Sequence, residues 1–134
     1  MRVREEVISE IVQQWLAKAE ADFGLASDLL SEDRYLSAVG FHSQQAAEKF
    51  LKAFLVEHQV EFPKTHKIAD LLDLIAPVHS VLAASLRDAD VLSPYGAEIR
   101  YPGDIPELNL ETASRAVQLA AQVRQAIYAA LETR

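Results

Sequence analysis

The feature that most limits how this chain can fold is the position of its five prolines. They are Pro63, Pro77, Pro94, Pro102 and Pro106, all within the middle of a 134-residue sequence. Proline has no backbone N–H and its ring clashes with the preceding helical turn, so it ends or kinks a helix. Residues 1–62 and 107–134 are therefore free to form long, uninterrupted helices, whereas the prolines divide the region between them.

Apolar residues in both proline-free segments recur every three or four positions, which is the period of an amphipathic helix. In the first segment this pattern predicts one helix over residues 5–30 and a second over residues 35–58, with a turn at residues 31–33. A last long helix follows Asn109, because asparagine favours the N-cap position. Its apolar positions are Leu110, Ala113, Val117, Ala120, Ile127 and Leu131.

Shorter elements are expected in the middle of the chain. Thr65 is a suitable N-cap for a short helix, a further helix lies around or after Pro77, and a long loop or series of turns covers residues 92–108. No segment alternates apolar and polar residues as a strand does. The sequence therefore predicts a single all-α domain over residues 1–134, an up-and-down four-helix bundle with an additional short helix. The large side chains expected to be buried are Trp15, Phe50, Phe54 and Ile127.

Composition narrows the classes of function. Thirteen Lys and Arg residues against twenty Asp and Glu residues give a net charge of −7, which disfavours non-specific binding to nucleic acid. A phosphate ligand would need a few well-placed cations. The chain has no cysteine, contains no apolar run of membrane-spanning length, and does not begin like a secretory signal. We expect a cytoplasmic protein.

Several common routes to catalysis are missing from the sequence. No Glu is followed by His three positions later, and the four histidines have no metal-ligand spacing, so no metal site is expected. The four glycines stand far apart and form neither a dinucleotide-binding nor a phosphate-binding loop. No serine has the surroundings of a nucleophile elbow. We therefore expect no cofactor.

Two stretches carry a resemblance to a known family. The first reads YLSAVGFHSQQAAEKFLKA over residues 35–53, followed by PKTH at residues 63–66; the second reads YGAEIRYP over residues 95–102. In this order the motifs resemble the stand-alone prokaryotic HEPN domain, whose name stands for higher eukaryotes and prokaryotes nucleotide-binding. Trp15 and the acidic, alanine-rich residues 17–28 fit as well, so the resemblance covers essentially the whole chain.

The resemblance implies a helical bundle that usually forms a homodimer. Such domains are often encoded beside a small nucleotidyltransferase, with which they act as a toxin–antitoxin pair. Many are RNases that use an Arg and a following His separated by four to six residues. This chain departs from that motif, because no histidine occurs after His79 and none of its arginines has the required spacing. No catalytic residue can be carried over, which disfavours an enzymatic role.

The candidate ligand-binding residues lie in two segments. In the long loop, Arg100 could contact phosphate while Tyr101 and Tyr95 offer faces for stacking. Alternatively, Arg100 pairs with a nearby glutamate and Tyr101 packs the loop onto the bundle. The second segment holds Lys64, His66 and Lys67, where two cations meet the exposed N–H groups of a helix start. The alternative there is a histidine that only fixes the loop.

A further set of residues lies away from the main apolar stripe of the second helix. Its members are Phe41, Gln45, Glu48, Lys52 and Val56. Glu48 and Lys52 are four residues apart and could form a surface ion pair. Since Phe41 and Val56 are unusual on a solvated face, we favour a contact with a second subunit in a homodimer.

The leading hypothesis is a non-catalytic HEPN-like protein that binds a nucleotide, RNA or a nucleotidyltransferase-type partner, as part of a toxin–antitoxin system. One alternative is an RNase toxin with a non-standard active site around Arg100, in which His66 serves as the base. Another is a structural interaction module without a ligand.

Overall fold

The computed structural model of the protein describes residues 3–96 and 107–132, which form six helices and no strand. The three long helices are α1 (Arg4–Ser31), α2 (Leu36–Glu57) and α5 (Leu110–Glu132). Between α2 and α5 lie α3 (Ile68–Ile75), α4 (Ser80–Ser85) and the 3₁₀-helix η1 (Arg87–Gly96). The all-α helical bundle expected from the sequence is confirmed.

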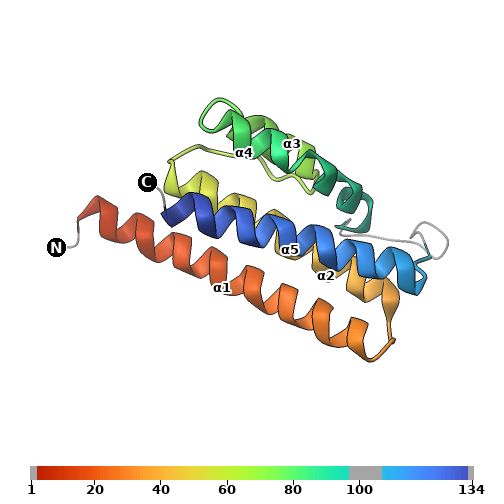
Figure 1. The fold of residues 1–134 in the computed structure, drawn as a ribbon. Helices are drawn as coiled ribbons and strands as arrows, with labels where there is room; N and C mark the ends of the chain where they lie inside the picture. The colour runs from red at the N-terminus through yellow and green to blue at the C-terminus, as the bar shows by residue number, and fades with distance from the viewer. Residues whose placement is uncertain (1–2, 97–106, 133–134) are drawn as a thin grey trace.

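The long helices pack side by side, and the shorter helices lie along one side of them (Figure 1). Helix α1 runs antiparallel to both α2 and α5, while α3, α4 and η1 pack above them. After α4, η1 returns the chain to the end of the bundle where α5 begins. Helix α2 is central, since it contacts α1, α3, η1 and α5.

The core is built mainly around α2. Phe50, Phe54 and Ile127 are fully buried, as expected from the periodicity. Trp15 was expected to be buried with them, but it is only partly buried and packs against the edge of the core. Its indole ring packs over the Lys52 ammonium of α2, which lies 5.5 Å from the ring centre.

The segment after Pro77 differs from a single regular helix. It is divided into α4 and the ten-residue η1, which contains Pro94 and extends into the region expected to be a loop. Two side chains of η1 bond the start of α3: Asp90 Oδ1 accepts from Ala69 N (2.9 Å) and Ser93 Oγ accepts from Ile68 N (2.8 Å). Since runs of 3₁₀-helix this long are uncommon, we attribute η1 in part to these tertiary bonds.

Candidate functional site: a buried polar network on α2

Three polar side chains lie one turn apart along one side of α2. They are Gln44, Glu48 and Lys52, with exposed fractions of 0%, 3% and 8%. Spacing of four residues places them in a row. Charged side chains are almost never buried without partners. The side chains that pair with this row therefore form a candidate site together with it.

Glu48 is the centre of the network. Its Oε2 accepts a hydrogen bond from Lys52 Nζ (2.9 Å), and its Oε1 lies 2.9 Å from His66 Nδ1 and 3.1 Å from Gln44 Nε2. Burial raises the pKa of the Glu48 carboxyl, but the hydrogen bonds from Lys52, His66 and Gln44 outweigh it and hold the pKa below its usual value. Because an ionised carboxylate only accepts hydrogen bonds, the proton between the two side chains belongs to His66 Nδ1.

Gln44 joins this centre to the backbone that precedes α3. Its Nε2 donates a second hydrogen bond to the carbonyl oxygen of His66 (2.9 Å), and its Oε1 accepts one from Gln45 Nε2 (2.7 Å). The His66 segment is thus held through both its ring and its backbone. The ring remains partly accessible, with 36% of the side chain exposed.

Aromatic rings, not water, surround the Lys52 ammonium. Its Nζ lies 5.5 Å from the ring centres of both Trp15, on α1, and Phe62, in the linker between α2 and α3. The two rings meet edge to face at 6.2 Å. Cation–π attraction and the Glu48 carboxylate together keep the buried ammonium paired.

Two glycines let η1 and the start of the α5 region approach α2 beside this network. A Cβ added at Gly96 would overlap the side-chain amide of Gln44, and one added at Gly40 would lie 2.8 Å from Leu108 Cδ2 and 3.3 Å from Tyr95 Cγ. The described residues on either side of segment 97–106 therefore lie against the same helix. One of these contacts is with Gln44 itself.

The expected ligand-binding residues are only partly brought together. His66 is a member of the network, and Lys64 and Lys67 lie exposed on either side of it. Tyr95 is partly buried against Gly40 and the core, which fits a packing role better than a free stacking face. Arg100 and Tyr101 lie outside the described residues.

The expectation of free N–H groups beside Lys64, His66 and Lys67 is not met at the first two residues of α3. The exposed N–H groups expected at the start of α3 include those of Ile68 and Ala69, and both already bond Ser93 and Asp90. The helix begins at Ile68, and Thr65, the expected N-cap, instead accepts from Lys67 N and donates to Asp70. An internal carboxylate thus occupies the place where an external anion was expected.

The set of residues expected at a dimer contact divides into two groups. Phe41, Gln45 and Val56 are partly buried within the single chain and keep some accessible surface. Glu48 and Lys52 do form an ion pair, but it is buried inside one chain instead of lying on the surface or under a second subunit. The reason is that Trp15, Phe62 and His66 cover this part of α2.

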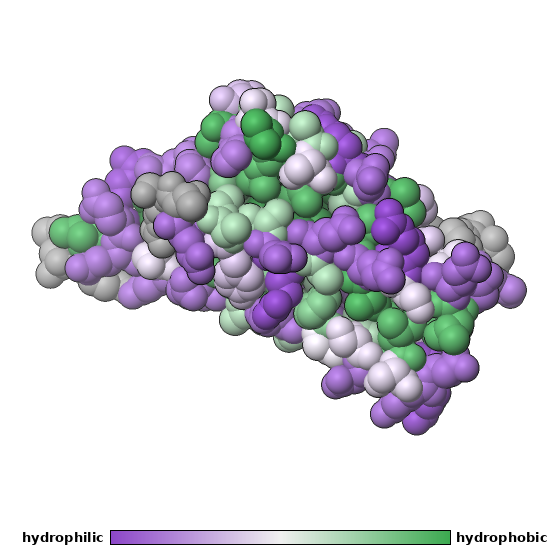
Figure 2. All heavy atoms as spheres, in the orientation of Figure 1, coloured by the Kyte–Doolittle hydropathy of each residue, from purple (hydrophilic) through white to green (hydrophobic). Residues whose placement is uncertain are grey.

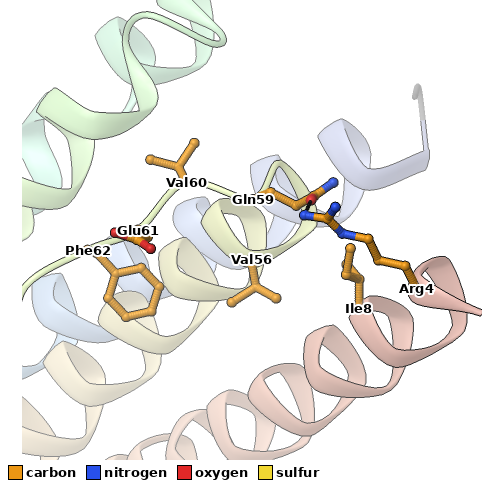
Figure 3. Close-up of a pocket in the computed structure, with 7 residues that line it drawn as sticks. All are labelled: Arg4, Ile8, Val56, Gln59, Val60, Glu61 and Phe62. Atoms are coloured by element: carbon orange, nitrogen blue, oxygen red, sulfur yellow. Dashed lines mark hydrogen bonds between the residues drawn. The ribbon is translucent and has the colours of Figure 1, made fainter.

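A shallow hollow adjoins Val56 at the end of α2 (Figure 3). Its lining residues are Arg4, Ile8, Val56, Gln59, Val60, Glu61 and Phe62. Arg4 closes one side by donating a hydrogen bond to Gln59. The hollow extends the partly apolar surface of α2 towards α1.

Sequence reasoning missed a second cluster on α2. Asp22 of α1 accepts from Lys49 Nζ at 2.5 Å and lies 2.8 Å from His42 Nδ1, which ties α1 to α2. Such pairing depends on which helix packs next to α2 and leaves no local sequence signal.

Within residues 3–96 and 107–132 no three His, Asp or Glu side chains gather as metal ligands would. No helix in the same described ranges is long and apolar enough to cross a membrane.

The fold and the polar network define a small helical domain with a partly exposed histidine supported by a buried carboxylate. Comparison with protein families adds that the HEPN domain matches residues 12–130. The chain therefore belongs to the HEPN domain family. Its structure is similar to the crystal structure of TT1696 from Thermus thermophilus, with 28% identity and a TM-score of 0.67. That similarity covers 87% of this chain and 95% of TT1696. A search of curated proteins found no match.

Proposed function

We propose that this protein is a non-catalytic HEPN-domain protein that binds a nucleotide or an RNA phosphate next to His66. It would act as a homodimer together with a nucleotidyltransferase-type partner, as part of a toxin–antitoxin system. The observation that carries the ligand proposal is the buried row of Gln44, Glu48 and Lys52, which supports His66 at the protein surface. A buried network whose members hydrogen-bond one another holds His66 more firmly than a surface histidine without such partners would be held.

The cations for phosphate would come from two segments. Lys64 and Lys67 flank His66 in the sequence. Arg100 comes four residues after Gly96, and Gly96 lies against the Gln44 side chain. Arginine offers a planar fork that matches two phosphate oxygens, and Tyr101 offers a stacking face. Because the protein has a net charge of −7, affinity would rest on these short-range contacts.

Titration of the protein with a panel of nucleotides and a short RNA, followed by amide chemical shifts, tests this proposal. We expect shifts centred on residues 64–67 and near Arg100, and much weaker binding in Arg100→Ala and His66→Asn. Arg115→Ala, on the exposed side of α5, serves as the matched arginine control. Shifts centred elsewhere, or unchanged binding in both site variants, would leave the domain as an interaction module without this ligand.

A second candidate is an RNase in which His66 acts as the base and Arg100 stabilises the phosphate. The hydrogen bond between Glu48 and His66 favours it, since a carboxylate commonly fixes the orientation and tautomer of a catalytic histidine. Against it stands the absence of the family's Arg–His spacing, and loss of a positioned base costs roughly 10²–10⁴ in rate. We expect no cleavage of labelled RNA above background. Cleavage that disappears in both Arg100→Ala and His66→Asn would establish the second candidate instead.

A further inference from the structure

Among the described residues 3–96 and 107–132, the end of the bundle where α1 turns into α2 and α5 begins keeps apolar side chains partly exposed. It lies opposite the end where the chain termini are found (Figure 1). The buried apolar cluster here consists of the small side chains Ala26, Val39 and Ala113. Larger side chains that pack around this cluster remain partly exposed, and they are Leu29, Leu30, Leu36, Leu108 and Val117. Figure 2 shows hydrophobic patches among hydrophilic ones over this part of the molecule.

Two large apolar side chains extend this surface into solvent. Tyr35 is 66% exposed and Leu110 is 48% exposed. Tyr35 adopts the left-handed conformation with φ 53° and ψ 51°, which side chains with a Cβ rarely adopt, and Asp33 two residues earlier also has φ 53°. Arg34 lies 4.9 Å from the centre of the tyrosine ring and donates to its hydroxyl at 3.2 Å. The turn therefore presents an exposed aromatic ring, and tyrosine is enriched among the residues that dominate binding at protein interfaces.

The charges on the same turns are mainly negative. The exposed acidic residues are Asp28, Glu32, Asp33, Glu107 and Glu111. Among the described residues of the same turns, the arginines are Arg34 and Arg115. Arg34 already pairs with Glu32 at 3.6 Å and lies over the Tyr35 ring. An apolar centre with an acidic rim complements an apolar centre with a basic rim.

We propose that this end of the bundle is a docking surface for a partner protein that presents an amphipathic basic helix, with aliphatic side chains on one face and Lys or Arg beside them. The five carboxylates repel nucleic acid, so phosphate backbones are poor occupants. A second copy of this chain is also a poor occupant, because a symmetric contact would bring the two acidic rims together. The surface and its partner do not depend on ligand binding at His66.

A designed helical peptide of leucine and lysine, and the same peptide with glutamate in place of lysine, test the proposal on the isotope-labelled full chain. We expect the lysine peptide to shift amides of residues 28–36 and 107–117, and the glutamate peptide not to bind. Combining Tyr35→Asn, which tolerates the left-handed conformation, with Leu110→Gln should weaken binding by about tenfold or more. Val81→Asn, at a 73% exposed position on α4, should leave binding unchanged.

Other results would overturn the proposal. Shifts spread over acidic residues of the whole surface would mean non-specific charge attraction. Equal binding of the glutamate peptide would show that the acidic rim does not select the partner. Unchanged affinity in the double variant would exclude the apolar centre. If these amides broaden with protein concentration in the absence of peptide, the occupant is a second copy of the chain.

Discussion

Glu48 is a carboxylate with almost no contact with water, and its value to the protein depends on its partners. Replacing it with glutamine keeps a carbonyl oxygen but removes the negative charge, and so leaves the Lys52 ammonium buried without its counter-charge. Breaking a buried pair in this way costs about 3–5 kcal/mol, so Glu48→Gln should lower the free energy of unfolding by that order in urea titrations. The control is Glu20→Gln, which removes a more exposed pair with Arg124 and should cost no more than about 1 kcal/mol. Equal losses in the two variants would contradict the burial argument.

The same carboxylate makes stability depend on pH in a defined direction. The pKa of Glu48 is held below its usual value of 4.5, so its contribution is fully present above that pH. It is lost as the pH falls through the lower, folded-state pKa, because the unfolded chain then binds the proton more readily. We therefore expect the difference in unfolding free energy between the wild type and Glu48→Gln to shrink as the pH falls below about 4.5. A difference that grows towards acid pH would show that Glu48 is protonated in the folded protein.

Three glycines on different helices offer a graded test of the contact between η1 and α2. Gly24 has no atom within 4 Å of an added Cβ, so Gly24→Ala should stabilise α1 by about 0.5–1 kcal/mol. An added Cβ at Gly96 would overlap the buried Gln44 amide, and Gln44 is fixed by its hydrogen bonds. Gly96→Ala should therefore cost roughly 1–3 kcal/mol. Gly40→Ala should lie between them, since its added Cβ meets the flexible end of Leu108 and lies 3.3 Å from the Tyr95 ring. Thermal unfolding of all three variants measures the order of these stability changes. If η1 does not pack against Gln44, Gly96→Ala will not be the most destabilising of the three.

At the scale of helices, the long elements could be predicted from sequence and the short ones only in part. Apolar periodicity placed α1, α2 and α5 within a few residues of their observed bounds, because the pattern repeats over many turns. The division into α4 and η1 was missed, since Asp90 and Ser93 bond residues more than 20 positions earlier in the chain.

The candidate site was only partly predictable for the same reason. Glu48 and Lys52 lie off the main apolar stripe of α2, which indicated a surface or an interface. The linker that carries Phe62 and His66 covers them together with Trp15, and periodicity within α2 carries no information about that cover.

The hydrogen bond from Ala69 N to Asp90 predicts that η1 stabilises the start of α3. Asp90 accepts from Ala69 N and from Ser93 Oγ, so Asp90→Ala leaves the start of α3 without its carboxylate. Loss of such a cap costs about 0.5–2 kcal/mol, and hydrogen exchange should accelerate at Ala69 and the following turn of α3. The matched control is Asp88→Ala, an exposed aspartate of the same helix. Equal protection of α3 in both variants would mean that the cap contributes nothing.

For the whole molecule, the main prediction concerns its assembly. Phe41 and Val56 of α2 are partly exposed on either side of the part that Trp15, Phe62 and His66 cover. The hollow next to Val56 continues this surface towards Ile8 of α1. We predict that two copies meet over this face, and that light scattering at micromolar concentration gives twice the monomer mass of 14.9 kDa. Phe41→Glu should return the protein to the monomer mass, because it places an unpaired charge where apolar surface would be covered.

Two controls separate assembly from folding in this experiment. Val81→Glu introduces the same charge at a 73% exposed position on α4 and should remain dimeric. The helical signal of Phe41→Glu should match that of the wild type, because Phe41 is only partly buried in the single chain. A wild-type mass of 14.9 kDa across the concentration range would reject the dimer. A Phe41→Glu variant that remains folded and dimeric would instead move the contact to another face, since a charge at the centre of an apolar interface cannot be accommodated without loss of affinity.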